Sequence, residues 1–246
     1  MQKKKTLPDT SASSSWQENI KKQQRSDGMK KYIIWAGIIA VCVVALGGLI
    51  YFANKSTGAA SVAGQVESNL PKVTSDDIIV GNPKASETIT EYGDMQCPAC
   101  AQYNPLVNQV LDSYKGKVRL VFRFFPLPQH QNAWVSAEAA YAAWKLGKFP
   151  EMKDKLFDSQ ADWESIPNAD AQSKFIGFAK SLGLDQTKFK TLMDSQAAKA
   201  FVQNDDNEAT SLALNSTPTF FLGNKLIVPQ SLTDFKTLID ADLKNK

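Results

Sequence analysis

Apolar residues in this chain are concentrated first in one uninterrupted stretch, from Tyr32 to Ala53, which contains no charged side chain. As a helix, these 22 residues would span about 33 Å, close to the ~30 Å hydrocarbon core of a bilayer. Aromatic residues lie near both ends, at Tyr32, Trp35, Tyr51 and Phe52, as is typical of membrane interfaces. The apolar core of a secretory signal peptide is shorter, about 7–15 residues, so we predict an uncleaved transmembrane anchor over residues 32–53 that lies in the lipid bilayer.

Polar sequence flanks this stretch on both sides. Residues 1–31 contain eight basic and three acidic side chains, whereas the remaining residues contain 20 basic and 22 acidic ones. We expect a disordered basic tail over residues 1–31 and a flexible linker over residues 54–76. The positive-inside rule places the tail in the cytoplasm and everything after Lys55 outside the cell membrane. Because the basic excess belongs to the tail, the main body is not expected to bind nucleic acid.

The apolar pattern after the linker alternates between strand and helix periods. Residues 78–80 and 87–92 are predicted to be strands, and a helix is expected from Cys97 to about Tyr114. Residues 118–125 alternate apolar side chains with Arg119 and Arg123, which predicts a strand with one apolar face. A strand, a helix and a second strand in this order indicate a parallel pair joined by a crossover.

A long helical region then interrupts the strands. Between about residues 130 and 214, apolar residues recur at intervals of three and four, which predicts five successive helices. Two short strands follow, separated by Gly223-Asn224, a favourable two-residue hairpin turn. Ser231 and Asp234 then resemble a capping box before a final helix. The pattern predicts an α/β domain over residues 77–246 with a helical insertion at about 130–214.

The candidate chemistry lies between the second predicted strand and the helix that follows it. Cys97, Pro98, Ala99 and Cys100 form a Cys-x-x-Cys sequence at the start of this helix. A thiol at a helix N-terminus faces unpaired backbone N–H groups and the positive end of the helix dipole, and both favour the thiolate. The second cysteine, three residues on, lies on the same helical face, so the pair can close a disulfide and carry two electrons.

Two other roles for this pair have less support. A structural disulfide across two residues closes too short a loop to stabilise a domain appreciably. A closed zinc site needs four ligands, and the domain offers only His130 and no further cysteine, so we predict redox chemistry and no metal. His130 itself is interpreted as a residue of the turn that enters a helix.

The order of these elements resembles the thioredoxin fold with an inserted helical subdomain, here preceded by one transmembrane helix. The run Glu-x-x-Asp-x-x-Cys-Pro-x-Cys from Glu91 to Cys100, with Thr-Pro-Thr-Phe-Phe-x-Gly from Thr217, resembles the DsbA-like thiol–disulfide oxidoreductases. The similarity is greatest to membrane-anchored members of Gram-positive type and covers about residues 73–246.

This resemblance implies a role for each matching residue. Cys97 would be the nucleophile and Cys100 its buried partner, with Pro98 and Ala99 between them in the active-site loop. Thr217 and Pro218 would form a cis-proline loop that lies against the disulfide and binds the substrate chain. Glu91 would be a buried acid that exchanges a proton with Cys100, although its position on a strand also allows a solvent-facing side chain.

The resemblance also implies a function outside the cytoplasm. The domain would donate disulfides to cysteine-containing secreted or surface proteins and be reoxidised by a quinone-linked membrane protein, with no bound cofactor. Ala99 occupies a position where the family often has histidine or an aromatic residue, and alanine adds nothing that stabilises the Cys97 thiolate. A disulfide reductase or isomerase is therefore an alternative. An anchored binding module that uses the cysteines to hold a metal or a partner is another.

Overall fold

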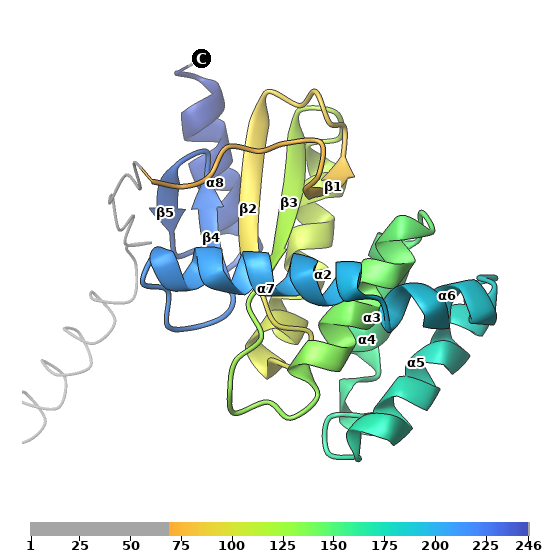
Figure 1. The fold of residues 1–246 in the computed structure, drawn as a ribbon. Helices are drawn as coiled ribbons and strands as arrows, with labels where there is room; N and C mark the ends of the chain where they lie inside the picture. The colour runs from red at the N-terminus through yellow and green to blue at the C-terminus, as the bar shows by residue number, and fades with distance from the viewer. Residues whose placement is uncertain (1–68, 246) are drawn as a thin grey trace, which may run out of the picture. The chain divides into compact units, whose positions relative to one another are not determined.

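The computed structural model describes residues 69–245 (Figure 1). The predicted tail over residues 1–31, the predicted anchor over residues 32–53 and most of the predicted linker lie outside the described residues. Within residues 69–245, no helix has both the length and the apolar character that crossing a membrane requires.

A five-stranded sheet forms the centre of the domain, with the strand order β1-β3-β2-β4-β5. The strands are β1 (Ile78–Gly81), β2 (Glu87–Gly93), β3 (Val118–Phe124), β4 (Thr219–Leu222) and β5 (Lys225–Ile227). β2 and β3 pair in parallel, as the crossover pattern predicts, and the other pairs are antiparallel. The predicted hairpin at Gly223-Asn224 joins β4 to β5. β2, which leads into the cysteine pair, is therefore held on both sides.

Seven helices accompany the sheet in residues 69–245. They are α2 (Pro98–Ser113), α3 (Ala133–Lys145), α4 (Phe149–Asp158), α5 (Asn168–Ser181), α6 (Gln186–Met193), α7 (Gln196–Ser211) and α8 (Leu232–Leu243), with a 3-10 turn at Gln160–Asp162. The five helices predicted for the insertion are α3 to α7. The predicted cap at Ser231 is present, because the Asp234 backbone N–H donates to Ser231 Oγ at 3.2 Å. The return bond to Asp234 Oδ2 comes from the Gln230 N–H, at 2.9 Å, one residue before the N-cap whose N–H would complete a capping box.

Helices cover both faces of the sheet (Figure 1). α2 and α8 pack behind it, where the Tyr103 ring of α2 lies 5.3 Å from that of Phe220 and 6.4 Å from that of Phe235. α7 crosses the front, where Tyr92 and Phe221 pack edge to face at 6.0 Å. Adjacent residues of a strand point to opposite faces, so Phe220 and Phe221 each contribute to a different core layer.

The helical insertion shares the core of the sheet. Phe149 of α4 packs against Phe122 of β3, with ring centres 5.5 Å apart. Phe201 of α7 contacts Tyr141 and Trp144 of α3, each at 5.1 Å, and so joins two helices of the insertion. Because these aromatic contacts are buried or half-buried, the insertion is fixed against the end of the sheet that carries the cysteine pair.

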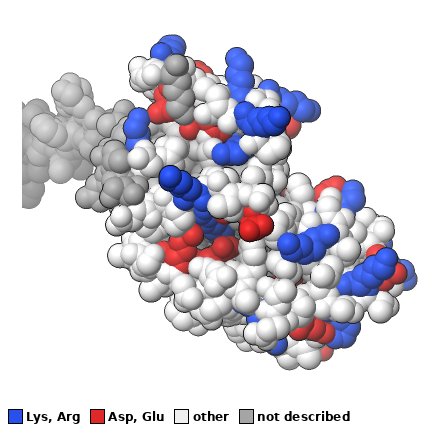
Figure 2. Space-filling model, turned by 45° about the horizontal axis from the view of Figure 1, so that its top comes forward, with Lys and Arg blue, Asp and Glu red and all other residues white. Residues whose placement is uncertain are grey.

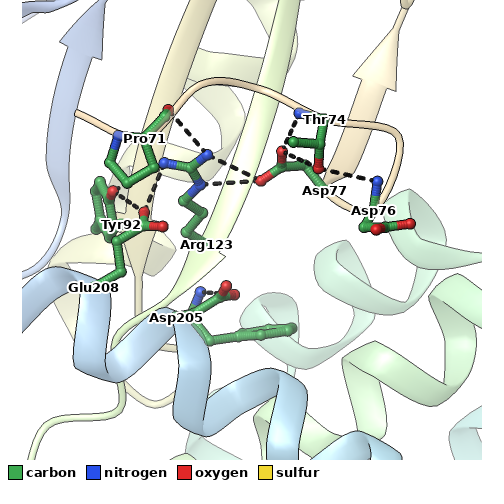
Figure 3. A network of polar contacts seen from close by, with 9 residues as sticks. Pro71, Thr74, Asp76, Asp77, Tyr92, Arg123, Asp205 and Glu208 are labelled. Carbon is green, nitrogen blue, oxygen red and sulfur yellow. Dashed lines mark hydrogen bonds and ion pairs between the residues drawn. The ribbon is translucent and has the colours of Figure 1, made fainter. Parts of the chain in front are cut away.

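The sequence pattern predicts that β3 has one apolar face, but at Arg123 its opposite face is buried as well. Arg123 is buried rather than exposed, because α7 covers its side of the sheet. Its guanidinium lies 3.0 Å from Asp77 and 2.6 Å from Glu208, and it donates to the Tyr92 hydroxyl at 3.0 Å (Figure 3). This network joins β2, β3 and α7 to the segment that precedes β1.

Charged side chains are mixed on the surface. On the face drawn in Figure 2, Lys and Arg side chains are interspersed with Asp and Glu side chains over a mostly uncharged surface. No extended field of a single sign covers the described residues on that face.

Candidate active site

The cysteine pair lies at the junction of β2 and α2. β2 ends at Gly93, a three-residue loop follows, and α2 begins at Pro98 with Cys97 as its N-cap. Proline suits the first position of a helix because its missing N–H would have no intrahelical partner there. Pro98 is exposed and Ala99 is half-buried, whereas only 6% of Cys97 is exposed. Cys97 therefore presents a small part of its sulfur at the helix start.

The environment of Cys97 favours its thiolate. Its pKa is lowered from 9.0 to about 5, chiefly because the Cys100 side chain hydrogen-bonds to its sulfur. Burial acts in the opposite direction, while the Thr217 side chain and the backbone N–H groups of Cys100 and Ala99 lower the pKa further. These N–H groups belong to the first turn of α2, so the helix start contributes as its position in the sequence predicts.

The pKa of Cys100 is shifted in the opposite direction from that of Cys97. Both cysteines are free thiols in this structure, and Cys100 is fully buried. Burial is the main reason why the pKa of Cys100 is raised well above 9.0, and the neighbouring Cys97 raises it further. At neutral pH the pair therefore consists of an outer thiolate and an inner thiol that donates to it.

Glu91 lies beneath this pair on β2. It is 2% exposed and stands opposite Phe122 of β3 and Phe220 of β4, so a solvent-facing position is wrong. Burial raises the pKa of Glu91 from 4.5 to about 7, the cation of Lys153 opposes this rise, and Cys97 adds to it. The carboxyl group is thus poised to gain or lose a proton near neutral pH.

Thr217 and Pro218 lie directly beside the outer cysteine, although they are 120 residues away in the sequence. The peptide bond between them is cis. The Thr217 carbonyl oxygen is 3.3 Å from Cys97 Sγ, which donates to it when protonated. The backbone of this loop therefore lies within reach of any chain that joins Cys97 in a disulfide.

A groove adjoins the same loop. It has a volume of about 490 Å³, and its lining includes Tyr103, Leu214, Pro218, Phe220, Leu226 and Val228. None of these side chains is charged, and Val228 is one of the most exposed large apolar residues in the described part of the chain, at 40%. The groove is suited to an uncharged stretch of polypeptide.

Residues of the insertion hold the loop before Cys97 through side-chain and backbone groups. Gln160 Nε2 donates to the Met95 carbonyl at 2.9 Å, and the Asn132 N–H donates to Gln96 Oε1 at 2.6 Å. Gln96 in turn donates to the Glu164 carbonyl at 2.8 Å. The sequence carries no local signal for these contacts, because each partner is more than 30 residues away.

Asp94 and His130 form a second brace on this loop. Asp94 accepts hydrogen bonds from the backbone N–H groups of Gln96 at 2.7 Å and Leu127 at 2.9 Å. His130 Nδ1 lies 2.7 Å from Asp94 Oδ2, so the histidine in the turn before α3 contacts the redox loop. Burial is the largest influence on Asp94 and raises its pKa.

Among residues 69–245, no three histidine, cysteine, aspartate or glutamate side chains lie together as a metal site would require.

Comparison with known proteins identifies the family and the fold. A family model described as thioredoxin matches residues 73–241. The structure is similar to that of oxidised BdbD from Bacillus subtilis, with a TM-score of 0.61 and 23% identity over 68% of this chain and 93% of BdbD. It is also similar to the structure of alpha-DsbA1 from Wolbachia pipientis, with a TM-score of 0.63 and 22% identity. That match covers 71% of this chain and 94% of alpha-DsbA1. At these identities, the likeness concerns the fold.

Curated relatives of higher identity are much longer than the matched region. The chain is 34% identical over 150 residues to a protein named Na(+)/H(+) antiporter NhaA 1 from Salinispora arenicola, a match of 61% of this chain and 22% of the antiporter. The protein of the same name from Mycobacterium sp. strain KMS matches at 34% over 152 residues, or 24% of its length. The chain thus spans about a quarter of the length of these relatives or less.

Proposed function

Because this chain belongs to the thioredoxin family, we propose that it is a thiol–disulfide oxidoreductase whose Cys97–Cys100 pair donates disulfides to other proteins. One observation carries the proposal: the outer sulfur is stabilised as a thiolate by its inner partner, beside the backbone of Thr217. A stable reduced form makes a cysteine pair an oxidant, since its disulfide then tends to accept electrons.

The reaction proceeds by two exchanges at sulfur. A substrate thiolate attacks Sγ of Cys97 in the oxidised pair, the Cys97–Cys100 bond breaks, and Cys100 leaves as a thiolate. The Cys100 sulfur then takes a proton, and protonated Glu91 is the acid beneath it. A second substrate thiolate attacks the substrate sulfur of the mixed disulfide, so Cys97 leaves as a thiolate. The substrate loses two electrons to the pair and gains a disulfide.

The low pKa of Cys97 assists the last step and favours the donor direction. A thiolate of low basicity is a good leaving group, so release of the oxidised substrate is fast. The lowered pKa arises from Cys100, Thr217 and the first turn of α2, so the absence of a polar side chain at Ala99 does not prevent it. Reductase and isomerase activities would use the same exchange with a less stable thiolate.

Other features of the chain support a proposal for the substrate and for the location of the domain. The uncharged groove beside Pro218 supports an extended polypeptide as substrate. The apolar stretch over residues 32–53 supports a single-pass anchor of Gram-positive type, with the domain outside the cell membrane. There we propose that cysteine-containing secreted or surface proteins are oxidised and that a quinone-linked membrane protein restores the disulfide.

Two cysteine variants of the full-length chain test the reaction. Wild-type protein is expected to accelerate disulfide formation in a reduced, unfolded ribonuclease. Cys97→Ser should abolish this activity, whereas Cys100→Ser should accumulate mixed disulfides that are visible on non-reducing gels. Cys42→Ser, at the third cysteine of the chain, is the matched control and should behave as wild type.

Two outcomes would contradict the proposal. If wild-type protein and both variants oxidised the ribonuclease equally slowly, the pair would serve a binding module instead of an enzyme. If the pair had a reduction potential near that of thioredoxin, about −270 mV, the donor direction would be wrong although the exchange itself would stand.

A further inference from the structure

A fully buried carboxylate lies in the loop between β2 and α2. The side chain of Asp94 is 0% exposed, although a carboxylate away from water is costly unless donors compensate its charge. Burial is the largest influence on Asp94 and raises its pKa, whereas hydrogen bonds from three donors lower it. The strongest of these donors is the His130 side chain, followed by the backbone N–H groups of Leu127 and Gln96. His130 is therefore the main partner that favours the carboxylate.

His130 reaches this carboxylate from the segment between β3 and α3. Its Nδ1 atom lies 2.7 Å from Asp94 Oδ2, and because a carboxylate only accepts hydrogen bonds, Nδ1 carries the hydrogen. The turn around His130 is itself hydrogen-bonded. The His130 N–H donates to the Leu127 carbonyl at 3.0 Å, and the Ala133 N–H donates to the His130 carbonyl at 3.2 Å. The imidazole ring thus holds Asp94 from a supported backbone.

The same segment binds both sides of the peptide bond between Gly93 and Asp94. The Gly93 carbonyl accepts the Phe125 N–H at 2.9 Å, and Asp94 Oδ2 accepts the Leu127 N–H at the same distance. In a trans peptide the C=O and N–H groups point in opposite directions, so the Asp94 N–H is directed away from Phe125. The orientation of this peptide plane is therefore fixed by residues that follow β3.

The backbone of Asp94 contacts both cysteines. Its carbonyl oxygen accepts the Cys97 N–H at 3.0 Å, which closes the turn before α2. Burial is the main reason why the pKa of Cys100 is raised, and Cys97 and Glu91 raise it further. A hydrogen bond from the Asp94 backbone acts in the opposite direction and favours the Cys100 thiolate. The fixed N–H of Asp94 therefore serves the inner sulfur when that sulfur is charged.

We propose that Asp94 and His130 are positioning residues for thiol–disulfide exchange, which hold the Asp94 N–H against the inner sulfur while Cys100 leaves as a thiolate. The inference deepens the proposed function and rests on it. As a substrate thiolate attacks Cys97, the electron pair of the Cys97–Cys100 bond goes to the Cys100 sulfur. The Asp94 N–H stabilises that charge until Glu91 supplies the proton. Asp94 and His130 exchange no proton themselves, so their contribution is geometric.

This hydrogen bond stabilises a charge that neither end state contains. The Cys100 sulfur is uncharged in the oxidised pair, and in the reduced pair it is a thiol, because its pKa lies well above 9.0. An interaction that is strong only while the charge is present lowers the barrier without moving the equilibrium. Its loss should therefore slow exchange by the same factor in both directions and leave the reduction potential unchanged.

Two variants of His130 in the full-length protein test the inference. His130→Leu removes the donor, whereas His130→Asn retains an N–H group at the position of Nδ1 and is the matched rescue. The rate at which reduced glutathione opens the enzyme disulfide at pH 7, followed by quenched flow, should fall about 3- to 10-fold in the leucine variant. Asparagine should restore most of that rate. His130→Ala provides a second variant without the donor if the leucine variant folds poorly.

Two equilibrium measurements separate positioning from a general loosening of the loop. The reduction potential and the titration of the Cys97 thiolate at 240 nm should be the same in the wild-type and leucine proteins. A slower rate accompanied by a matching change in either quantity would overturn the inference. So would a wild-type rate in a folded His130→Leu protein, or an asparagine variant as slow as the leucine variant. The proposed function would stand in each of these cases, whereas absence of exchange in the wild-type protein would overturn it.

Discussion

The stability of the reduced protein should depend on pH through Cys97. Because its folded pKa is depressed, the thiolate stabilises the folded state fully above the unfolded pKa of 9.0, and this contribution disappears as the pH falls through about 5. The test is therefore to lower the pH from 7 to 5 and to compare the stability of the protein, kept reduced by excess dithiothreitol, at the two values. As a whole residue Cys97 is 6% exposed, so solvent screens its interactions only weakly.

The size of the effect follows from the two pKa values of Cys97. With values of 9.0 and about 5, the thiolate contributes about 2.7 kcal/mol to the free energy of unfolding at pH 7 and about 0.4 kcal/mol at pH 5. Cys100 stays protonated in both states over this range, because its folded pKa lies well above 9.0. The expected loss due to Cys97 is therefore about 2.3 kcal/mol.

Urea unfolding of reduced wild-type protein and Cys97→Ser at the two pH values measures this loss. The serine variant cannot form the thiolate, and Glu91, whose pKa is about 7, titrates in both proteins, so the difference between them cancels most of its contribution. The free-energy difference between the two proteins should fall by about 2 kcal/mol between pH 7 and pH 5.

A fall of less than about 0.5 kcal/mol would refute the assigned electrostatics. So would a thiolate absorbance at 240 nm that titrates near pH 9 in the wild-type protein. If the effect is present, the same 2.7 kcal/mol favours the reduced form and makes the pair about 60 mV more oxidising at pH 7 than one with an ordinary thiol.

Two further substitutions test the packing around the site by urea unfolding at pH 7. Arg123→Met should lower the free energy of unfolding by about 3–5 kcal/mol, because it leaves Glu208 without its buried cation. A loss below about 1 kcal/mol would contradict the importance of this network. Gly93→Ala should cost about 1–3 kcal/mol, since the added Cβ would lie 2.6 Å from Cζ of Phe122. Gly177→Ala is its control: no atom outside its own helix lies within 4 Å, so an equal loss there would contradict the steric argument.

Local patterns in the sequence were sufficient for the helices and strands, whereas the thioredoxin-like arrangement was implied by the family resemblance. The alternation in residues 118–125 and the three-to-four spacing after residue 130 appear as β3 and as the five helices α3 to α7. The turn at Gly223-Asn224 and the cap at Ser231 are equally local signals, and both are in place. Each of these features depends on a few neighbouring residues, which is why a single sequence can predict them.

Burial of charged residues could not be predicted in the same way. Arg123 falls on the polar side of an alternating strand, and only the position of α7 shows that this side is covered. Lys153 stands between Met152 and Asp154 in a helix rich in charges, and nothing nearby distinguishes it from the exposed Lys155. Such positions depend on how distant elements pack, which a local pattern does not contain.

The two sulfurs of the site are thus controlled from different parts of the chain. The pKa of Cys97 depends on Cys100, on the first turn of α2 and on Thr217, all of which touch its sulfur. The pKa of Cys100 depends on burial, on Cys97 and on Glu91. The pKa of Glu91 depends on burial and on the charge of Lys153, which the insertion supplies. Changes in the insertion should therefore alter the pH dependence of the inner sulfur while the outer thiolate is kept. An insertion that only covered the site would have no such selective effect.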